Sequence, residues 1–332
     1  MTAAHPCSMS TGIVAIGRNE GSRLAACLRS IRDFVPAIVY VDSGSQDDSV
    51  ALARGAGADV VELDLRTPFT AARARNAGFT RLIELHPDLE FVFFVDGDCE
   101  VADGWMSAAV AFIREHADVA VVCGIRRERY PQRSIYNRLC DIEWQSAPFG
   151  DTKACGGDAL IRTLALQKAG GYDAALICGE EPDLCIRLRQ SGWRIWHLDH
   201  SMTIHDAAIH SFRQWWRRTR RAGYAYAQGV AMHGAPPERH WVAESRRSWL
   251  WGLGIPAAVI VCSTFDLRLG LAMLAVYPLQ WIRLASRTSV YRDVRWQWAG
   301  ATLIGKFPEM IGQLQYWLAR LRRTRQALIE YK

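Results

Sequence analysis

Short apolar runs alternate with segments of helical periodicity over the first 120 residues. The alternation is clearest between the first two runs, where Leu24, Leu28 and Ile31 follow helical spacing. Strands alternating with helices in this way favour an α/β fold whose mostly parallel sheet is flanked by helices. The runs that predict strands are 12–16, 38–41, 60–63 and 91–95, of which the last is fully apolar.

Acidic residues follow two of these predicted strands. Asp42 comes directly after the second run and Asp96 directly after the fourth. Ligands of such sheets bind beyond the carboxyl ends of the strands, so both side chains are candidates for a binding site.

Asp96 and Asp98 are separated only by Gly97, and both carboxylates can face one cation. Oxygen ligands favour Mg²⁺ or Mn²⁺, and these ions usually share their coordination shell with substrate phosphates. The alternative is a polar turn before the next helix, with Asp103 as the helix cap. The position at a strand end favours the cation site.

A second acidic pair precedes a predicted helix. Glu180 and Glu181 stand before Pro182, which suits the first helical position, and Leu184 and Leu188 share one helix face. Either glutamate can serve the helix dipole, but two exceed what capping needs. One of them is therefore a candidate general base.

Composition narrows the class of protein. Half of the 332 residues are hydrophobic and 22% are charged, which excludes a disordered chain and a polytopic membrane protein. The net charge of +6 favours anionic partners, for which nucleoside diphosphates, nucleic acid and acidic lipid headgroups all qualify. The nine cysteines include no Cys-x-x-Cys pair, and no signal peptide is evident, so we expect a reducing, cytoplasmic setting.

The pattern changes near residue 207, and we expect a catalytic domain over 1–206 and a helical region over 207–332. Residues 212–229 are basic and rich in tryptophan, which fits a solvated helix, a lipid interface or a diphosphate-bearing substrate. The stretches 249–265 and 269–282 are apolar, with arginines at both outer ends. They predict a membrane hairpin with both ends cytoplasmic, a re-entrant or in-plane segment, or a buried helical hairpin. We favour membrane attachment.

Taken in order, these motifs resemble glycosyltransferase family 2, whose members have the GT-A fold. The resemblance covers about residues 11–210 and is more specific than any single motif. The segments that carry it are Ile13-Val14-Ala15-Ile16 followed by Arg18-Asn19-Glu20, then Asp42-Ser43-Gly44-Ser45-Gln46-Asp47, Arg75-Asn76-Ala77-Gly78, Asp96-Gly97-Asp98 and Glu180-Glu181-Pro182-Asp183-Leu184.

The resemblance implies a role for each matching residue. Asp42 would bond the nucleobase of a nucleotide sugar, for which the family favours UDP, and Arg75 would help hold the nucleotide. Asp96 and Asp98 would bind the divalent cation, Mg²⁺ or Mn²⁺, together with the donor's ribose and diphosphate. Glu181 matches the family's catalytic base, with Glu180 as the other candidate.

Two further features carry weaker expectations. Gly156, Gly157 and Asp158 match a small-residue position on the acceptor side of the family, although a simple turn explains them equally. His205 is a candidate for completing the metal shell, although a lone histidine is more often structural. The segment Gln214-Trp215-Trp216-Arg217-Arg218 departs from the Gln-x-x-Arg-Trp motif of synthases, which favours single-sugar transfer.

We therefore expect an inverting glycosyltransferase that moves a sugar from a nucleotide-diphosphate sugar to a hydroxyl of a lipid-linked saccharide or polysaccharide. We expect it at the cytoplasmic face of the cell membrane, without nucleic acid as a partner. The alternatives are a sugar nucleotidyltransferase and a catalytically inactive, membrane-associated nucleotide-sugar binding protein. The first needs a glycine-rich phosphate loop, and residues 17–21 match one poorly.

Overall fold

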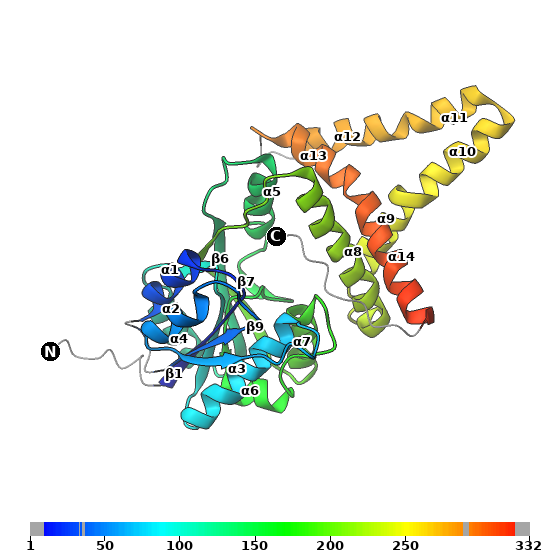
Figure 1. The fold of residues 1–332 in the computed structure, drawn as a ribbon. Helices are drawn as coiled ribbons and strands as arrows, with labels where there is room; N and C mark the ends of the chain where they lie inside the picture. The colour runs from blue at the N-terminus through cyan, green and yellow to red at the C-terminus, as the bar shows by residue number, and fades with distance from the viewer. Residues whose placement is uncertain (1–9, 33, 35–36, 288–291, 323–332) are drawn as a thin grey trace. The chain divides into compact units, whose positions relative to one another are not determined.

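The structure is a computed structural model that describes residues 10–32, 34, 37–287 and 292–322 (Figure 1). Cys7 lies outside these residues. The chain divides into two compact units. The first comprises the chain up to Tyr130 together with Glu143–Ala207, and the second comprises Pro131–Ile142 and the chain from Ala208 onward.

The first unit is built on one mixed sheet with helices on both of its sides (Figure 1). Its strands are β1 (Thr11–Gly17), β2 (Ile38–Asp42), β3 (Asp59–Glu62), β4 (Phe91–Asp96), β5 (Cys99–Val101), β6 (Val119–Glu128), β7 (Gly150–Thr152), β8 (Ala159–Arg162) and β9 (Arg194–His205). Its helices are α1 (Ser22–Ile31), α2 (Ser49–Gly55), α3 (Ala71–Leu85), α4 (Trp105–Glu115), α6 (Thr163–Lys168) and α7 (Glu180–Gln190).

The strand order places the acidic residues together. The sheet runs β3-β2-β1-β4-β8-β6-β9-β5, with β7 beside β9, and the strands from β3 to β4 are parallel. β1 lies between β2 and β4, where Gly17 pairs with Asp42 and Ile16 with Asp96. Both acids therefore lie at the same carboxyl edge, where open α/β sheets bind ligands.

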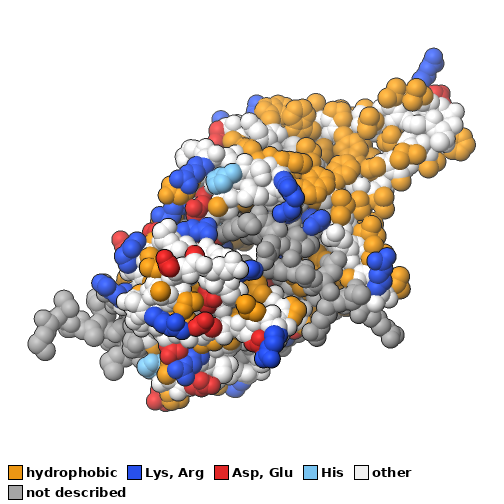
Figure 2. All heavy atoms as spheres, in the orientation of Figure 1, with side chains coloured by type: hydrophobic (Ala, Val, Ile, Leu, Met, Phe, Trp, Pro, Cys, Tyr) orange, Lys and Arg blue, Asp and Glu red, His pale blue; other side chains and the backbone are white. Residues whose placement is uncertain are grey.

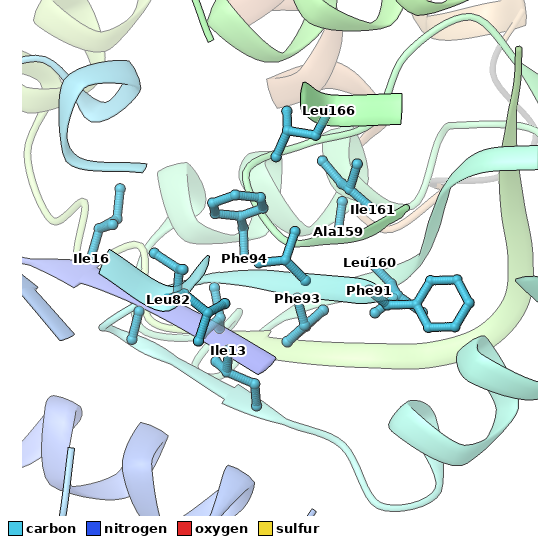
Figure 3. Close-up of a cluster of buried hydrophobic side chains, with 14 of the residues drawn as sticks. Ile13, Ile16, Leu82, Phe91, Phe93, Phe94, Ala159, Leu160, Ile161 and Leu166 are labelled. Carbon is cyan, nitrogen blue, oxygen red and sulfur yellow. The ribbon is translucent and has the colours of Figure 1, made fainter. Parts of the chain in front are cut away.

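The apolar runs of β1, β2 and β4 form the core because they are buried on both faces of the sheet, whereas the run in the edge strand β3 is only partly buried. Figure 3 shows Phe91, Phe93 and Phe94 of β4 among side chains of β1, β8 and the covering helices. Gly78 of α3 lies against β1 and β2, where a Cβ atom would come within 2.3 Å of Val14. The fold is thus the α/β class that the alternation of strands and helices predicts.

The second acidic motif starts its helix earlier than expected. α7 begins at Glu180, and the preceding Gly179 has a φ of 83°, a left-handed conformation that glycine adopts without strain. Pro182 lies within the first turn, where helical N–H groups have no partner within the helix. Both glutamates are therefore part of the helix rather than of the loop before it.

The second unit is helical. Its helices are most of α5 (Ile135–Trp144), α8 (Phe212–His233), α9 (Val242–Trp249), α10 (Ile255–Phe265), α11 (Leu267–Leu274), α12 (Val276–Arg287), α13 (Arg295–Ile304) and α14 (Lys306–Arg322), with a π-helical turn at Leu250–Gly254. α8 and α14 approach closely at Gly223 and Gly312, where added Cβ atoms would lie 2.0 Å from backbone oxygens of the opposite helix.

Candidate active site

The Asp96-Gly97-Asp98 turn joins β4 to β5 and faces the end of β9. The Gly97 N–H donates to the Ile16 carbonyl at 2.8 Å, which fixes the turn to β1. Cys99 pairs with His205 across β5 and β9, and this pairing brings the His205 Nε2 atom within 3.2 Å of the Asp98 Oδ1 atom. α4 has Gly104 at its cap and receives no side-chain cap bond, so neither Asp98 nor Asp103 serves as its cap.

The donor atoms around Asp98 fit a hard divalent cation. The Nδ1 atom of His205 is buried and has no hydrogen-bond partner among the described residues. Asp98, Cys99 and His205 form one group of possible ligands and Asp96, Cys99 and Asp158 another. Burial raises the pKa of the Cys99 thiol well above its usual range, which disfavours the thiolate. Asp98 and His205 therefore offer the oxygen and nitrogen atoms that suit Mg²⁺ or Mn²⁺.

Arg75 of α3 links the cation turn to the acidic start of α7. Its Nη2 atom lies 3.0 Å from Asp96 Oδ1, and its Nη1 atom lies 2.9 Å from both Glu180 Oε1 and Glu181 Oε1. Burial opposes the charged guanidinium, but Glu181, Asp96 and Glu180 hold the pKa of Arg75 well above its ordinary value. Burial also raises the pKa of the Asp96 carboxyl, against the effect of Arg75.

Glu180 and Glu181 share this contact but differ in exposure. The Glu180 side chain is 5% exposed and the Glu181 side chain 16%. A proton acceptor must reach its substrate, so the geometry distinguishes Glu181 as the more accessible of the two.

Asp42 is buried and organises the loop after β2. Its Oδ2 atom accepts from the backbone N–H groups of Gly44 and Ser45 at 2.9 and 2.8 Å, and its Oδ1 atom accepts from the Ser45 hydroxyl at 2.5 Å. Asn19 fastens the loop after β1 to the same segment by accepting from the Gln46 N–H at 2.7 Å. The expected nucleobase contact of Asp42 would therefore be made from a rigid loop.

The Gly156-Gly157-Asp158 segment places its residues in different surroundings. Gly156 is exposed, and a Cβ atom added there would meet nothing within 4 Å. Gly157 is buried against the Arg75–Asp96 pair, since its Cβ atom would lie 2.6 Å from Arg75 Nη2. Asp158 is fully buried, so its side chain presents no surface to an acceptor.

Sequence reasoning missed Arg126 and Trp144. Arg126 of β6 lies 2.7 Å from Asp158 and 3.7 Å from Asp96, with its guanidinium over the Trp144 ring. Trp144 also meets the His205 ring edge to face at 4.7 Å between centroids. The sequence offers one signal, which is the pair Arg126-Arg127 directly after the apolar half of β6. This pair does not indicate that Asp158 is the partner of Arg126.

Part of the chain is similar to a known protein family. Residues 13–169 match the model of glycosyl transferase family 2. The chain is 26% identical over 252 residues to a pre-mycofactocin glycosyltransferase of Mycobacterium tuberculosis, found in two strains. This match covers 70% of the chain and 51% of the relative, so the chain spans about half the length of the curated relatives it matches.

A solved structure shares the fold over both units. The mannosyltransferase PcManGT from Pyrobaculum calidifontis, determined in complex with GDP-Man and Mn²⁺, has a TM-score of 0.60 and 16% sequence identity. The similarity covers 93% of this chain and 87% of that one. At this identity the likeness concerns the fold.

Proposed function

We propose that this chain, a glycosyltransferase of family 2 with the GT-A fold, transfers a single sugar from a nucleotide-diphosphate sugar to a hydroxyl acceptor with inversion. The observation that carries the proposal is the convergence of Asp96, Asp98, Glu181 and Arg75 at one carboxyl edge of the sheet. A UDP-sugar is the donor that the family favours, and the GDP-Man complex of the structural neighbour adds GDP-sugars to the candidates.

In this proposal the loops after β1 and β2 bind the nucleoside, with Asp42 toward the nucleobase. Asp98 and His205 hold the divalent cation, and Asp96 faces the donor's ribose and diphosphate. A bound Mg²⁺ or Mn²⁺ supplies positive charge to the departing diphosphate. Arg75 adds a fixed, buried charge beside it, in a setting where electrostatic stabilisation is strong.

Glu181 is the proposed general base. Its carboxylate takes the proton of the acceptor hydroxyl as the hydroxyl oxygen attacks the anomeric carbon opposite the departing diphosphate. Arg75 fixes the carboxylate in place at 2.9 Å. Gly156 leaves open space on the proposed acceptor side, where its missing side chain admits a sugar ring.

Membrane attachment is the second part of the proposal. Val242–Phe265 with 24 residues and Leu267–Arg287 with 21 are long and apolar enough to cross a membrane, and 11% of each apolar window is buried. Figure 2 shows apolar side chains covering this region. Exposed arginines flank the hairpin at both outer ends, which suits headgroups on the cytoplasmic face. They are Arg246, Arg247, Arg283 and Arg287.

α14 presents a second apolar surface in the same unit. Its exposed apolar side chains follow helical spacing and form one stripe along the helix. Arg320 and Arg322 lie near the C-terminal end of α14. Such a stripe beside basic residues suits a helix that lies in the lipid interface. An enzyme attached to the membrane surface in this way could reach a lipid-linked acceptor. The stripe consists of Leu314, Trp317, Leu318 and Leu321.

A donor screen tests the proposal. Full-length protein in detergent would be incubated with UDP-sugars and GDP-sugars, Mn²⁺ and sugar or polyprenyl-phosphate acceptors. We expect release of nucleoside diphosphate together with a glycosylated acceptor. Formation of UTP or GTP together with sugar 1-phosphate when pyrophosphate is added would instead indicate a nucleotidyltransferase. Donor binding without turnover across the screen would indicate a binding protein.

A further inference from the structure

Asp158 is fully buried, and each of its carboxylate oxygens has polar partners. The Oδ1 atom accepts from the backbone N–H of Asp96 at 3.0 Å. The Oδ2 atom accepts from the Thr203 hydroxyl at 2.7 Å and lies 2.7 Å from Arg126 Nη2. A buried carboxylate with this many partners is held in one position.

Arg126 supplies the charge that keeps this carboxylate ionised. Arg126 and Thr203 are opposite each other on β6 and β9, so the sheet itself brings the cation and the hydroxyl to the same oxygen. Burial opposes ionisation, but Arg126 first and then the Thr203 hydrogen bond hold the pKa of Asp158 below its usual range. The guanidinium also lies over the Trp144 ring, with its Cζ atom 5.7 Å from the ring centroid.

Two of the partners of Asp158 lie next to the candidate ligands Asp98 and His205 in the chain. Asp96 begins the turn that presents Asp98, and Thr203 lies two residues before His205 on β9. Residues two apart on a strand point to the same face, so fixing Thr203 also fixes the direction of His205. The carboxylate therefore bridges β4 and β9 directly behind the candidate ligand pair.

We propose that Asp158 is a positioning residue for the cation site, holding the turn after β4 and the end of β9 at the separation that lets Asp98 and His205 face one divalent cation. This inference rests on the cation site of the proposed function. Thr203 and Arg126 act through Asp158. Mutation of residues that hold metal ligands in place commonly lowers metal affinity by about 10–100-fold.

Thr203→Val is the sharpest test because valine has nearly the shape of threonine and lacks only the hydroxyl donor. Thr163→Val is the matched control. Thr163 is also buried, it follows the other end of β8, and its hydroxyl has no hydrogen-bond partner among the described residues. Asp158→Asn removes the carboxylate charge, and would leave the buried Arg126 without its nearer counterion.

The readout is the Mn²⁺ concentration that half-saturates binding of UDP or GDP to full-length protein, measured by titration calorimetry. We expect Thr203→Val to raise this concentration about tenfold, within the range for groups behind metal ligands, with nucleotide affinity restored by excess Mn²⁺. We expect a larger rise for folded Asp158→Asn and none for Thr163→Val. A purely structural role would lower the unfolding temperature without shifting the Mn²⁺ requirement.

Two outcomes would overturn the inference separately from the proposed function. An unchanged Mn²⁺ requirement in Thr203→Val, with the wild type binding nucleotide in a Mn²⁺-dependent way, would remove the positioning role and leave the proposed function intact. Wild-type protein that binds neither UDP nor GDP with Mn²⁺ would contradict both. If Asp158→Asn does not fold, the comparison of the two threonine variants decides.

Discussion

At the scale of single residues, the chemistry is concentrated where strands and one helix end. The sequence indicates Asp96 and Asp98 because they follow a predicted strand, where such sheets bind ligands. It indicates the glutamate pair because two acids exceed what capping one helix needs. It does not separate Glu180 from Glu181, since both precede the same proline. Their difference in exposure arises from the packing of α7 beside Arg75, which depends on residues about a hundred positions away.

Replacing Glu181 with glutamine tests the assignment of the base. The amide is nearly isosteric and cannot take the proton, so we expect donor binding to persist while turnover falls on the order of 10²–10⁴-fold. Glu180→Gln is the matched control because it loses the same contact with Arg75. A near-normal kcat in Glu181→Gln would refute the assignment, and a larger loss in Glu180→Gln would move the role to that residue.

At the scale of elements, local pattern predicts the α/β class and the positions of the first strands, because apolar runs of this length must be buried. It does not predict that β8 and β6 lie between β4 and β9, since such pairing depends on contacts distant in sequence. The bond from Thr203 to Asp158 spans 45 residues for this reason. The role of Arg126 cannot be predicted from the sequence for the same reason, because its partner Asp158 is distant in the chain.

Helix packing in the second unit gives a prediction at this scale. Gly223→Ala would place a Cβ atom 2.0 Å from the Glu309 carbonyl oxygen, so α8 and α14 would have to separate. We expect a loss of stability of about 1–3 kcal/mol, typical of overpacking. Gly300→Ala of α13 is the control, because its nearest neighbour would lie at 3.6 Å. Equal unfolding temperatures of the two variants in detergent would contradict the tight helix contact.

At the scale of the whole molecule, the chain combines a segment, residues 13–169, that matches the model of glycosyl transferase family 2 with a helical unit that exposes large apolar side chains. The sequence indicates two apolar segments but leaves open whether they are buried within the protein. The structure leaves most of their side chains exposed, and 11% of each apolar window is buried. Such an exposed apolar surface must be shielded from water, and we propose that membrane lipid shields it.

Charge introduced at the hairpin tip tests this attachment. Phe265 is 83% exposed and Leu267 65%, so Phe265→Glu with Leu267→Glu should leave the fold intact while opposing insertion into lipid. We expect reduced flotation with liposomes that contain anionic lipids. Leu164→Glu, at a 51% exposed position of α6, is the control and should float like the wild type. Full-length wild-type protein that is monodisperse without detergent and ignores liposomes would refute the attachment.

The central claim is that a divalent cation at Asp98 is required for sugar transfer. The most direct measurement is nucleoside diphosphate release from the best donor after EDTA treatment and after restoring Mg²⁺ or Mn²⁺, in wild type and in Asp98→Ala. We predict that EDTA abolishes release, that the cation restores it in the wild type, and that folded Asp98→Ala stays inactive at every cation concentration. Undiminished release in EDTA, or normal turnover by Asp98→Ala, would contradict the account.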